Sequence, residues 1–138
     1  MTMSFRTADG LTQDDLVALY SAVGWNAYTD EPDRLTAAVA ASLHVVTAWD
    51  GERLVGLARV VGDGLTIAYL QDILVDPDHQ RAGVGRELFR RAFEPYGDVR
   101  QKLLLTDDEP QQLAFYTSMG STEIRDLKHP TRAFAKFG

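Results

Sequence analysis

Hydrophobic residues recur with a helical period in the first part of the chain. Over residues 11–23 they lie three or four positions apart, on one face of a helix. Thr12, followed by two aspartates, fits the N-cap of this helix, and Gly24 fits its end. A second helix is expected over residues 31–42, because Pro32 stands at an early position that helices tolerate.

Further along, short apolar and β-branched runs bounded by turn residues predict strands. These runs cover residues 44–48, 53–61, 65–75, 102–106 and 133–137, with a weaker one near residues 4–6. Asp50-Gly51 is a hairpin signal between the first two of these runs, and residues 62–64 form the next turn. Helical patterns over residues 84–95 and 111–119 separate the later strands.

The order of these elements indicates the fold class. Antiparallel hairpins followed by a strand–helix–strand unit are typical of an α+β protein with a mixed, mostly antiparallel sheet flanked by helices. The helix between the strands around residues 71 and 103 requires those two strands to run parallel. A chain of 138 residues without internal repeats or a linker rich in Pro, Gly or Ser is expected to form a single domain over residues 1–138.

Composition narrows the functional classes. The chain has 14 basic and 20 acidic residues, a net charge of −6, which disfavours nucleic acid as a partner. No window approaches the ~20 apolar residues of a membrane helix, and the N-terminal residues lack the apolar core of a signal peptide. We therefore expect no membrane partner and a cytoplasmic location. Cysteine is absent and the three histidines (His44, His79, His129) show no metal-ligand spacing, so no metal is expected and each histidine is interpreted as a surface or loop residue.

The segment from residue 80 to 85 carries the strongest functional signal. Its sequence is Gln80-Arg81-Ala82-Gly83-Val84-Gly85, between the apolar run Ile73-Leu74-Val75 and a predicted helix. Glycine lets the backbone turn tightly, and the first N–H groups of a helix are free to bind an anion. The segment lacks the spacing and the Lys-Ser/Thr pair of a Walker A loop and the third glycine of the dinucleotide fingerprint.

This segment resembles the acyl-CoA pyrophosphate loop of the GNAT N-acetyltransferase superfamily. Gln80, Gly83 and Gly85 fill the three defining positions of that loop, and Ile73, Val75 and Pro77 fill its lead-in. A second segment, residues 113–120, resembles the family's Ala-x-x-Phe-Tyr-x-x-x-Gly-Phe pattern, with Ser121 in place of the usual aromatic residue. The resemblance spans about residue 50 to the C-terminus. It implies the GNAT fold, in which the two parallel strands part at one end and the pantetheine arm of acetyl-CoA enters the gap.

The resemblance also implies roles for individual residues. The backbone of Ile73, Leu74 and Val75 would contact pantetheine, because a splayed strand has N–H and C=O groups that need partners. The N–H groups of residues 80–85 would bind the diphosphate. Arg81 and Arg86 are either charge contacts to the phosphates or solvated helix charges. No metal is implied.

The implied reaction is the transfer of an acetyl group from acetyl-CoA to a primary amine of a small molecule or peptide, by direct attack. Tyr116 would protonate the departing thiolate, unless it is simply a core residue. The family's usual base positions fall on Tyr69 and Gln71, neither of which is a base at neutral pH. Asp72 is the nearest carboxylate, but strict alternation turns it away from Gln71 unless a bulge intervenes. Asp107, Asp108 and a water chain remain alternatives.

The acceptor pocket of this family is built by the first two helices and their connection. In this connection Trp25 and Tyr28 are candidate contacts for an apolar or aromatic amine, although Trp25 could instead close the core over the first helix. A second class of function is a non-catalytic acyl-CoA-binding sensor or regulatory module, since no strand carboxylate stands at the usual position. A homodimer is possible if the last predicted strand, residues 133–137, pairs across two copies.

Overall fold

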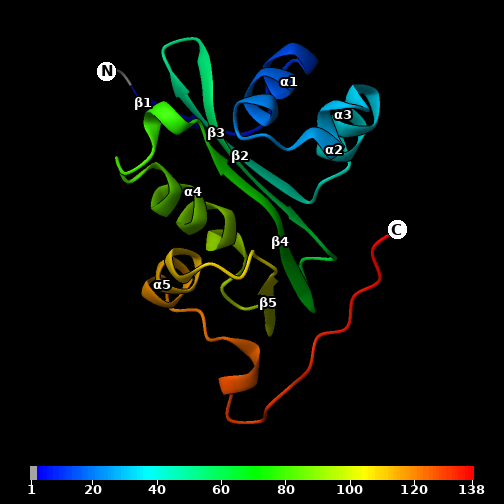
Figure 1. Cartoon of the computed structure of the whole chain (residues 1–138), viewed down its shortest axis with the longest axis vertical. Helices are drawn as coiled ribbons and strands as arrows, with labels where there is room; N and C mark the ends of the chain where they lie inside the picture. The colour runs from blue at the N-terminus through cyan, green and yellow to red at the C-terminus, as the bar shows by residue number, and fades with distance from the viewer. Residues whose placement is uncertain (1–2) are drawn as a thin grey trace. The chain divides into compact units, whose positions relative to one another are not determined.

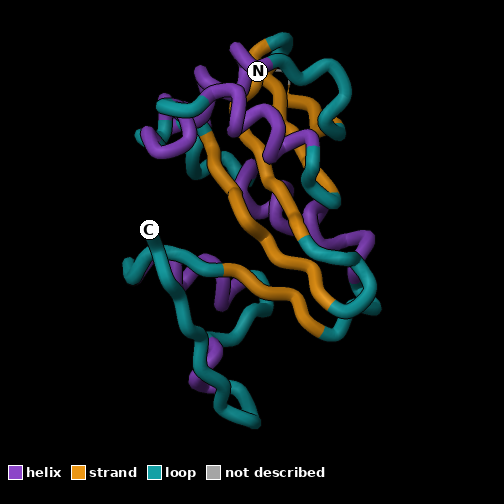
Figure 2. Tube along the Cα trace, turned by 90° about the vertical axis from the view of Figure 1, so that its right-hand side faces the viewer, coloured by secondary structure: helices purple, strands orange, loops and turns teal. Residues whose placement is uncertain are grey.

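Five strands form one mixed sheet in the computed structural model, which describes residues 3–138 (Figure 1). The strands lie in the order of the sequence and are β1 (Met3–Arg6), β2 (His44–Asp50), β3 (Arg53–Val61), β4 (Ile67–Val75) and β5 (Gln101–Leu104). Neighbouring strands are antiparallel except β4 and β5, which are parallel. The length of the antiparallel strands is clear in Figure 2. The predicted mixed, mostly antiparallel α+β architecture is confirmed.

The helices lie where the periodicity predicted them, with one addition. The α-helices are α1 (Gln13–Ala22), α2 (Asn26–Thr29), α3 (Pro32–Ala40), α4 (Val84–Phe93) and α5 (Pro110–Ser118), and the 3₁₀ turns are η1 (Pro77–His79), η2 (Glu94–Tyr96) and η3 (Ile124–Asp126). Thr12 and Asp15 cap α1 reciprocally through their side chains and backbone N–H groups. The short helix α2 was not predicted, since the segment after Gly24 was interpreted only as a connection.

The contacts within the chain define two compact units. The first comprises the described residues up to Leu105 and holds the sheet with α1–α4; the second is Thr106–Gly138 and holds α5. The predicted single domain over residues 1–138 stays a prediction.

Helices cover both faces of the sheet in the first unit. One face packs against α1 and α3 through buried residues of both layers: Leu16, Leu19, Tyr20, Leu35, Val39, Val45, Trp49, Leu57 and Leu74. The neighbouring strand residue Gly56 points the opposite way, since a Cβ added there would meet Leu88 and Val84 of α4. The sheet therefore separates α4 from α1 and α3, and β3 is buried on both faces.

Two sequence predictions about strands were wrong. Residues 133–137 form no strand, and Phe134 and Phe137 are 90% and 87% exposed. Their alternating pattern alone does not make these residues a strand, because a strand also needs a neighbouring strand that pairs with its N–H and C=O groups. Leu65 and Thr66 lie before β4, because the Asp63 carboxylate accepts their N–H groups and holds them in a turn. The prediction of a homodimer depended on this C-terminal strand, so it has lost its structural basis.

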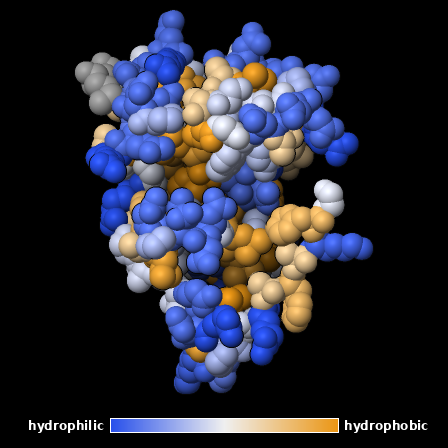
Figure 3. Space-filling model, in the orientation of Figure 1, coloured by the Kyte–Doolittle hydropathy of each residue, from blue (hydrophilic) through white to orange (hydrophobic). Residues whose placement is uncertain are grey.

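Figure 3 shows a mainly hydrophilic face on which hydrophobic side chains gather in patches near the middle of the view. Over the described part of the chain, none of the helices has the length and apolar character that crossing a membrane requires. Within residues 3–138, no group of three or more His, Asp or Glu side chains is arranged to hold a metal ion.

Candidate active site

The loop before α4 has the backbone geometry of an anion site. Gly83 is the N-cap of α4, with φ of 81°, and no side chain caps this helix. Arg81 is also left-handed, with φ of 67°, which is costly for a residue with a Cβ. Strain kept in a loop is typical of ligand-binding segments. The loop therefore presents the positive end of a helix dipole with no side-chain oxygen in the capping position.

A buried polar cluster ties the start of this loop to the β2–β3 hairpin. The Asp76 carboxylate accepts hydrogen bonds from Arg53 (2.7 Å) and from the N–H group of Asp78 (2.9 Å). Nε2 of His79 lies 3.0 Å from the Asp50 carboxylate, and the His79 side chain is only 10% exposed. His79 lies in a turn, which agrees with its interpretation as a surface or loop residue, although most of its side chain is covered. Gln80 continues the anchoring, since its amide donates to the carbonyl of Val75.

The parallel strands part just before the loop. The pairing of β4 with β5 ends at Leu70 and Leu104, whereas β4 continues to Val75. The segment Ile73–Val75 is still paired with β3 on its other side. Across residues 3–138, the recorded strand pairs leave the β5-facing edge of this segment without a partner strand. The predicted splay of the two parallel strands is thus present.

A bulge in β4 brings two neighbouring side chains to one face. The register of β3 on β4 shifts next to the pair Arg59–Asp72, which leaves Gln71 as an additional residue in β4. Both Gln71 and Asp72 contact the hydroxyl of Tyr28, at 3.4 and 2.8 Å. Strict alternation would have separated them, so the bulge provides the exception that the sequence analysis left open.

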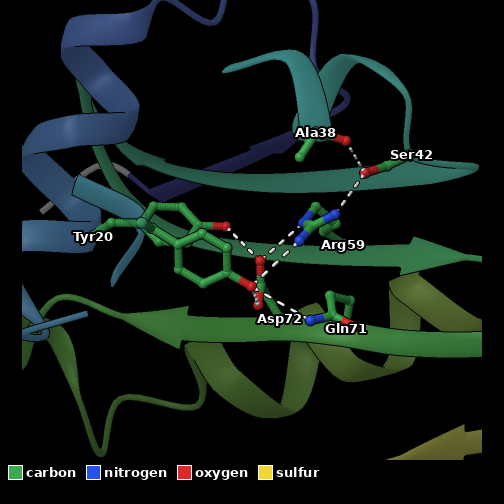
Figure 4. A network of polar contacts seen from close by, with 7 residues as sticks. Tyr20, Ala38, Ser42, Arg59, Gln71 and Asp72 are labelled. Carbon is green, nitrogen blue, oxygen red and sulfur yellow. Dashed lines mark hydrogen bonds and ion pairs between the residues drawn. The ribbon is translucent and has the colours of Figure 1, made fainter. Parts of the chain in front are cut away.

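Asp72 is the centre of a buried polar network (Figure 4). Its Oδ2 accepts hydrogen bonds from Arg59 Nε at 2.8 Å and from the Tyr20 hydroxyl at 2.9 Å, and its Oδ1 accepts one from Tyr28. The side chains of Asp72 and Arg59 are 3% and 7% exposed. Arg59 also contacts Ser42, whose hydroxyl donates to the carbonyl of Ala38. The carboxylate is therefore charge-balanced and enclosed by its three donors.

The network keeps its tyrosines protonated and its arginine charged. Burial, together with the negative charge of Asp72, raises the pKa of Tyr20 and of Tyr28 above that of a free phenol. Burial alone would lower the pKa of Arg59, but attraction to Asp72 outweighs it and the pKa is raised. Both tyrosines therefore act as hydrogen-bond donors to Asp72 at neutral pH.

A hollow lies beside this network. It has a volume of about 220 Å³ and is lined by residues of α2 and α3 and the segment between them: Ala27, Tyr28, Glu31, Arg34, Leu35 and Ala38. Glu31 and Arg34 are exposed and form an ion pair at 3.4 Å. Trp25 is absent from the lining and packs against the core, with its ring 5.9 Å from that of Tyr20. Of the two predicted acceptor contacts, the structure thus places Tyr28 at the hollow and Trp25 in the packing over α1.

Tyr116 lies on α5 in the second unit. Burial raises the pKa of its hydroxyl, and a hydrogen bond with Thr106 opposes that shift. Its ring makes an edge contact with Phe115 at 5.1 Å. In the same unit, the N-cap of α5 is Glu109 and no side chain caps the helix, so neither Asp107 nor Asp108 caps it.

Sequence reasoning missed Arg59 and Tyr20 as members of this site. Each of two apolar strands contains a single buried charge, Arg59 in β3 and Asp72 in β4. Because the two strands were predicted to be antiparallel neighbours, opposite charges in both were a detectable signal for a buried ion pair. Tyr20 was assigned only to the apolar face of α1, and nothing in its spacing distinguishes a hydrogen-bonded phenol from a packed one.

Comparison with known proteins agrees with this geometry. The family described as "Acetyltransferase (GNAT) domain" matches residues 41–121, which include β2 to β5, the loop and α5. The chain belongs to the GNAT family of acetyltransferases. Its predicted resemblance to this superfamily is confirmed.

Individual relatives support the same assignment. A solved GNAT-family acetyltransferase of Streptococcus pneumoniae is 32% identical, with a TM-score of 0.83 and coverage of 99% of this chain and 98% of its own. The chloroplastic "GCN5-related N-acetyltransferase 1" of Arabidopsis thaliana is 33% identical over 83% of this chain and 58% of its own length. The "Histone acetyltransferase TAP1" of Glycine max is 32% identical over 77% of this chain and 50% of its own. The chain spans about half the length of these two plant relatives.

Proposed function

We propose that this protein is an N-acetyltransferase that transfers an acetyl group from acetyl-CoA to a primary amine of a small molecule or peptide, by direct attack in a ternary complex. The observation that carries the proposal is the end of β4, which parts from β5 after Leu70 and leads into the uncapped start of α4. A gap between strands followed by an anion site suits a long ligand with amides at one end and phosphates at the other.

The residues around this gap fit acetyl-CoA. The backbone of Ile73, Leu74 and Val75 offers hydrogen-bonding groups along the unpaired edge of β4 for the pantetheine amides. Residues 80–85 offer N–H groups to the diphosphate, and the exposed Arg81 adds positive charge there. Arg86, in the first turn of α4, is a second candidate for a phosphate contact.

The proposed acetyl transfer requires three functional groups of the protein. A donor must stabilise the thioester oxygen as it gains negative charge, and N–H groups at the free edge of β4 are suited to this. A primary amine is mostly protonated near neutral pH, so a group must receive its proton before attack. Asp72 is the carboxylate of this part of β4, but its burial separates it from direct contact with an acceptor. Tyr116 is proposed to protonate the departing thiolate, because a phenol carries its proton at neutral pH.

The acceptor is proposed to bind in the hollow beside Tyr28. The hollow is lined by aliphatic side chains of α3 and by the exposed ion pair of Glu31 and Arg34. Trp25 contributes by packing against Tyr28 and Tyr20 and holding their rings in place, since the three rings contact one another. An amine with an apolar body fits this lining best.

The proposal is tested by binding and turnover measured separately. Titration calorimetry of the purified protein with acetyl-CoA and with CoA reports binding, and thiol release in the presence of a panel of primary amines reports acetyl transfer. We expect both. Absence of heat with either ligand, together with absence of turnover, would contradict the proposal.

Replacing Gly83 with alanine is expected to weaken acetyl-CoA binding about tenfold. The new Cβ would extend into open space at the start of α4, where the diphosphate is proposed to bind, and φ of +81° strains it. Gly10→Ala is the matched control, because Gly10 has φ of +78° and equally open surroundings. Calorimetry should show weaker binding only for the Gly83 variant; equal affinities in both variants would contradict a diphosphate contact at this position.

Replacing Tyr116 with phenylalanine is expected to lower kcat about 10²-fold and to leave the affinity for acetyl-CoA unchanged. The substitution keeps the ring contact with Phe115 and removes the hydroxyl, and with it the hydrogen bond with Thr106. The loss should be smaller with an acetyl thioester whose thiol is more acidic, because such a leaving group needs less protonation. An equal loss with both thioesters would indicate a structural role.

A non-catalytic acyl-CoA sensor is the second candidate function, favoured by one observation. Asp72 already accepts hydrogen bonds from three protein donors and is not exposed to an acceptor. In that case acetyl-CoA would bind, no amine would be acetylated, and Tyr116→Phe would behave as the wild type. Turnover of any amine at a rate that Tyr116→Phe lowers would exclude this candidate.

A further inference from the structure

One side chain connects the buried carboxylate to the hollow. Asp72 has three hydrogen-bond donors among the described residues, and of these only Tyr28 also lines the hollow. Tyr20 is completely buried and Arg59 is 6% exposed, so neither reaches a ligand in the hollow. Tyr28 is therefore the contact through which a molecule in the hollow could communicate with Asp72.

We propose that Tyr28 relays a proton from the acceptor amine to Asp72. The inference rests on the proposed acetyltransferase activity and identifies how that reaction removes the proton. Before attack, one N–H bond of the protonated amine breaks and Tyr28 Oη gains that proton; the electron pair of the broken bond stays on nitrogen as the lone pair that then bonds to the thioester carbonyl carbon. The original O–H bond of Tyr28 breaks at the same time, and Asp72 Oδ1 gains the proton, so Tyr28 stays a neutral phenol throughout.

The hydrogen bonds of Tyr28 have the direction that a relay needs. Its hydroxyl donates to Asp72 Oδ1 at 2.8 Å, which is a strong contact. The two donors to its oxygen, Gln71 Nε2 and Arg59 Nη2, both lie at 3.4 Å, near the limit of a hydrogen bond. Gln71 is exposed, so an amine N–H can replace this weak contact without breaking the strong one.

The other members of the network act as positioning residues. Arg59 and Tyr20 both bond to Oδ2, which leaves Oδ1 as the oxygen that faces Tyr28. Arg59 is the positive charge in contact with the carboxylate and balances its charge in this buried site. Once the product has left, the proton returns through Tyr28 to water.

Two matched variants test the relay. Tyr28→Phe and Tyr20→Phe each remove one hydroxyl that donates to the same carboxylate, but only Tyr28 reaches the hollow. With the amine that the wild-type protein acetylates fastest, Tyr28→Phe should lower kcat about 10²-fold, whereas Tyr20→Phe, which removes only a positioning contact with Asp72 Oδ2, should lower kcat by no more than about tenfold. Affinity for acetyl-CoA should be unchanged in both, and thermal unfolding should show that both variants fold.

The pH profile separates a relay from a packing role. In Tyr28→Phe the proton must leave to water or hydroxide, so its deficit in kcat should narrow between about pH 7 and about pH 9.5, whereas a packing defect would leave the ratio constant. An unchanged kcat with a raised KM, an equal loss in both variants, or a deficit independent of pH would each overturn the relay. Absence of wild-type turnover with every amine would overturn the proposed function instead, so the two failures are distinguishable.

Discussion

Replacing Asp72 with leucine is expected to lower the free energy of unfolding by about 3–5 kcal/mol. The substitution leaves the guanidinium of Arg59 buried without its counter-charge, and two tyrosine hydroxyls lose their acceptor. Urea denaturation at neutral pH, monitored by tryptophan fluorescence, measures the difference. An effect below about 1 kcal/mol would mean that water or another group replaces the carboxylate.

The double variant Arg59→Met/Asp72→Leu is the control for this result. It removes both charges and replaces them with apolar side chains of similar length, so it should recover most of the lost stability. Recovery would show that the ion pair is not required for folding. The double variant should still bind acetyl-CoA, but it lacks the carboxylate that accepts the proton. This combination would support the view that the charged pair is kept in the core for its role in the reaction.

Replacing Gly56 with valine is expected to destabilise the protein by about 1–3 kcal/mol and to weaken acetyl-CoA binding. A Cβ at this position would lie 2.9 Å from Leu88 Cδ1 and 3.3 Å from both Ala48 Cβ and Val84 Cγ1. The Leu88 side chain can rotate away from the new side chain, but the methyl group of Ala48 cannot. The remaining steric overlap is with Val84 and would displace it. Because Val84 is the first residue of α4, the displaced helix start is the one proposed to bind the diphosphate.

Gly97→Val is the control for the packing argument. Gly97 has an ordinary backbone conformation and a Cβ there would meet no atom within 4 Å, so its stability should change by less than about 0.5 kcal/mol. Denaturation and calorimetry on both variants measure the two effects together. Normal acetyl-CoA affinity in a destabilised Gly56→Val would mean that α4 does not transmit the strain to the loop.

Local patterns were sufficient to predict most of the fold. The alternating and helical periods placed β2, β3, α1 and α4 close to their observed ends, since these elements have one or two buried faces that the pattern records. The end of the chain was mispredicted for a physical reason. Residues 133–137 alternate like a strand, but pairing depends on a neighbour that the pattern does not contain.

The candidate site was predictable only in part. The loop was found because its glycines and its place between a strand and a helix are local features. The network around Asp72 joins residues 13 to 52 positions apart, so no local pattern reports it. The proposed role of Asp72 is revised in consequence: the sequence made it a candidate for direct contact with the amine, and because of its burial we propose Tyr28 as the contact instead.

The additional residue at Gln71 also changes how this strand must be compared with others. Leu70 lies opposite Val60, whose side chain shares the α4 side with Gly56, whereas Leu74 belongs to the core beneath α1. Even-numbered residues of β4 therefore face the α4 side of the sheet before Gln71 and the α1 side after it. A homologue that lacks this residue must place its counterpart of Asp72 one position away, so an alignment without a gap at this point would match a side chain of one layer to a side chain of the other.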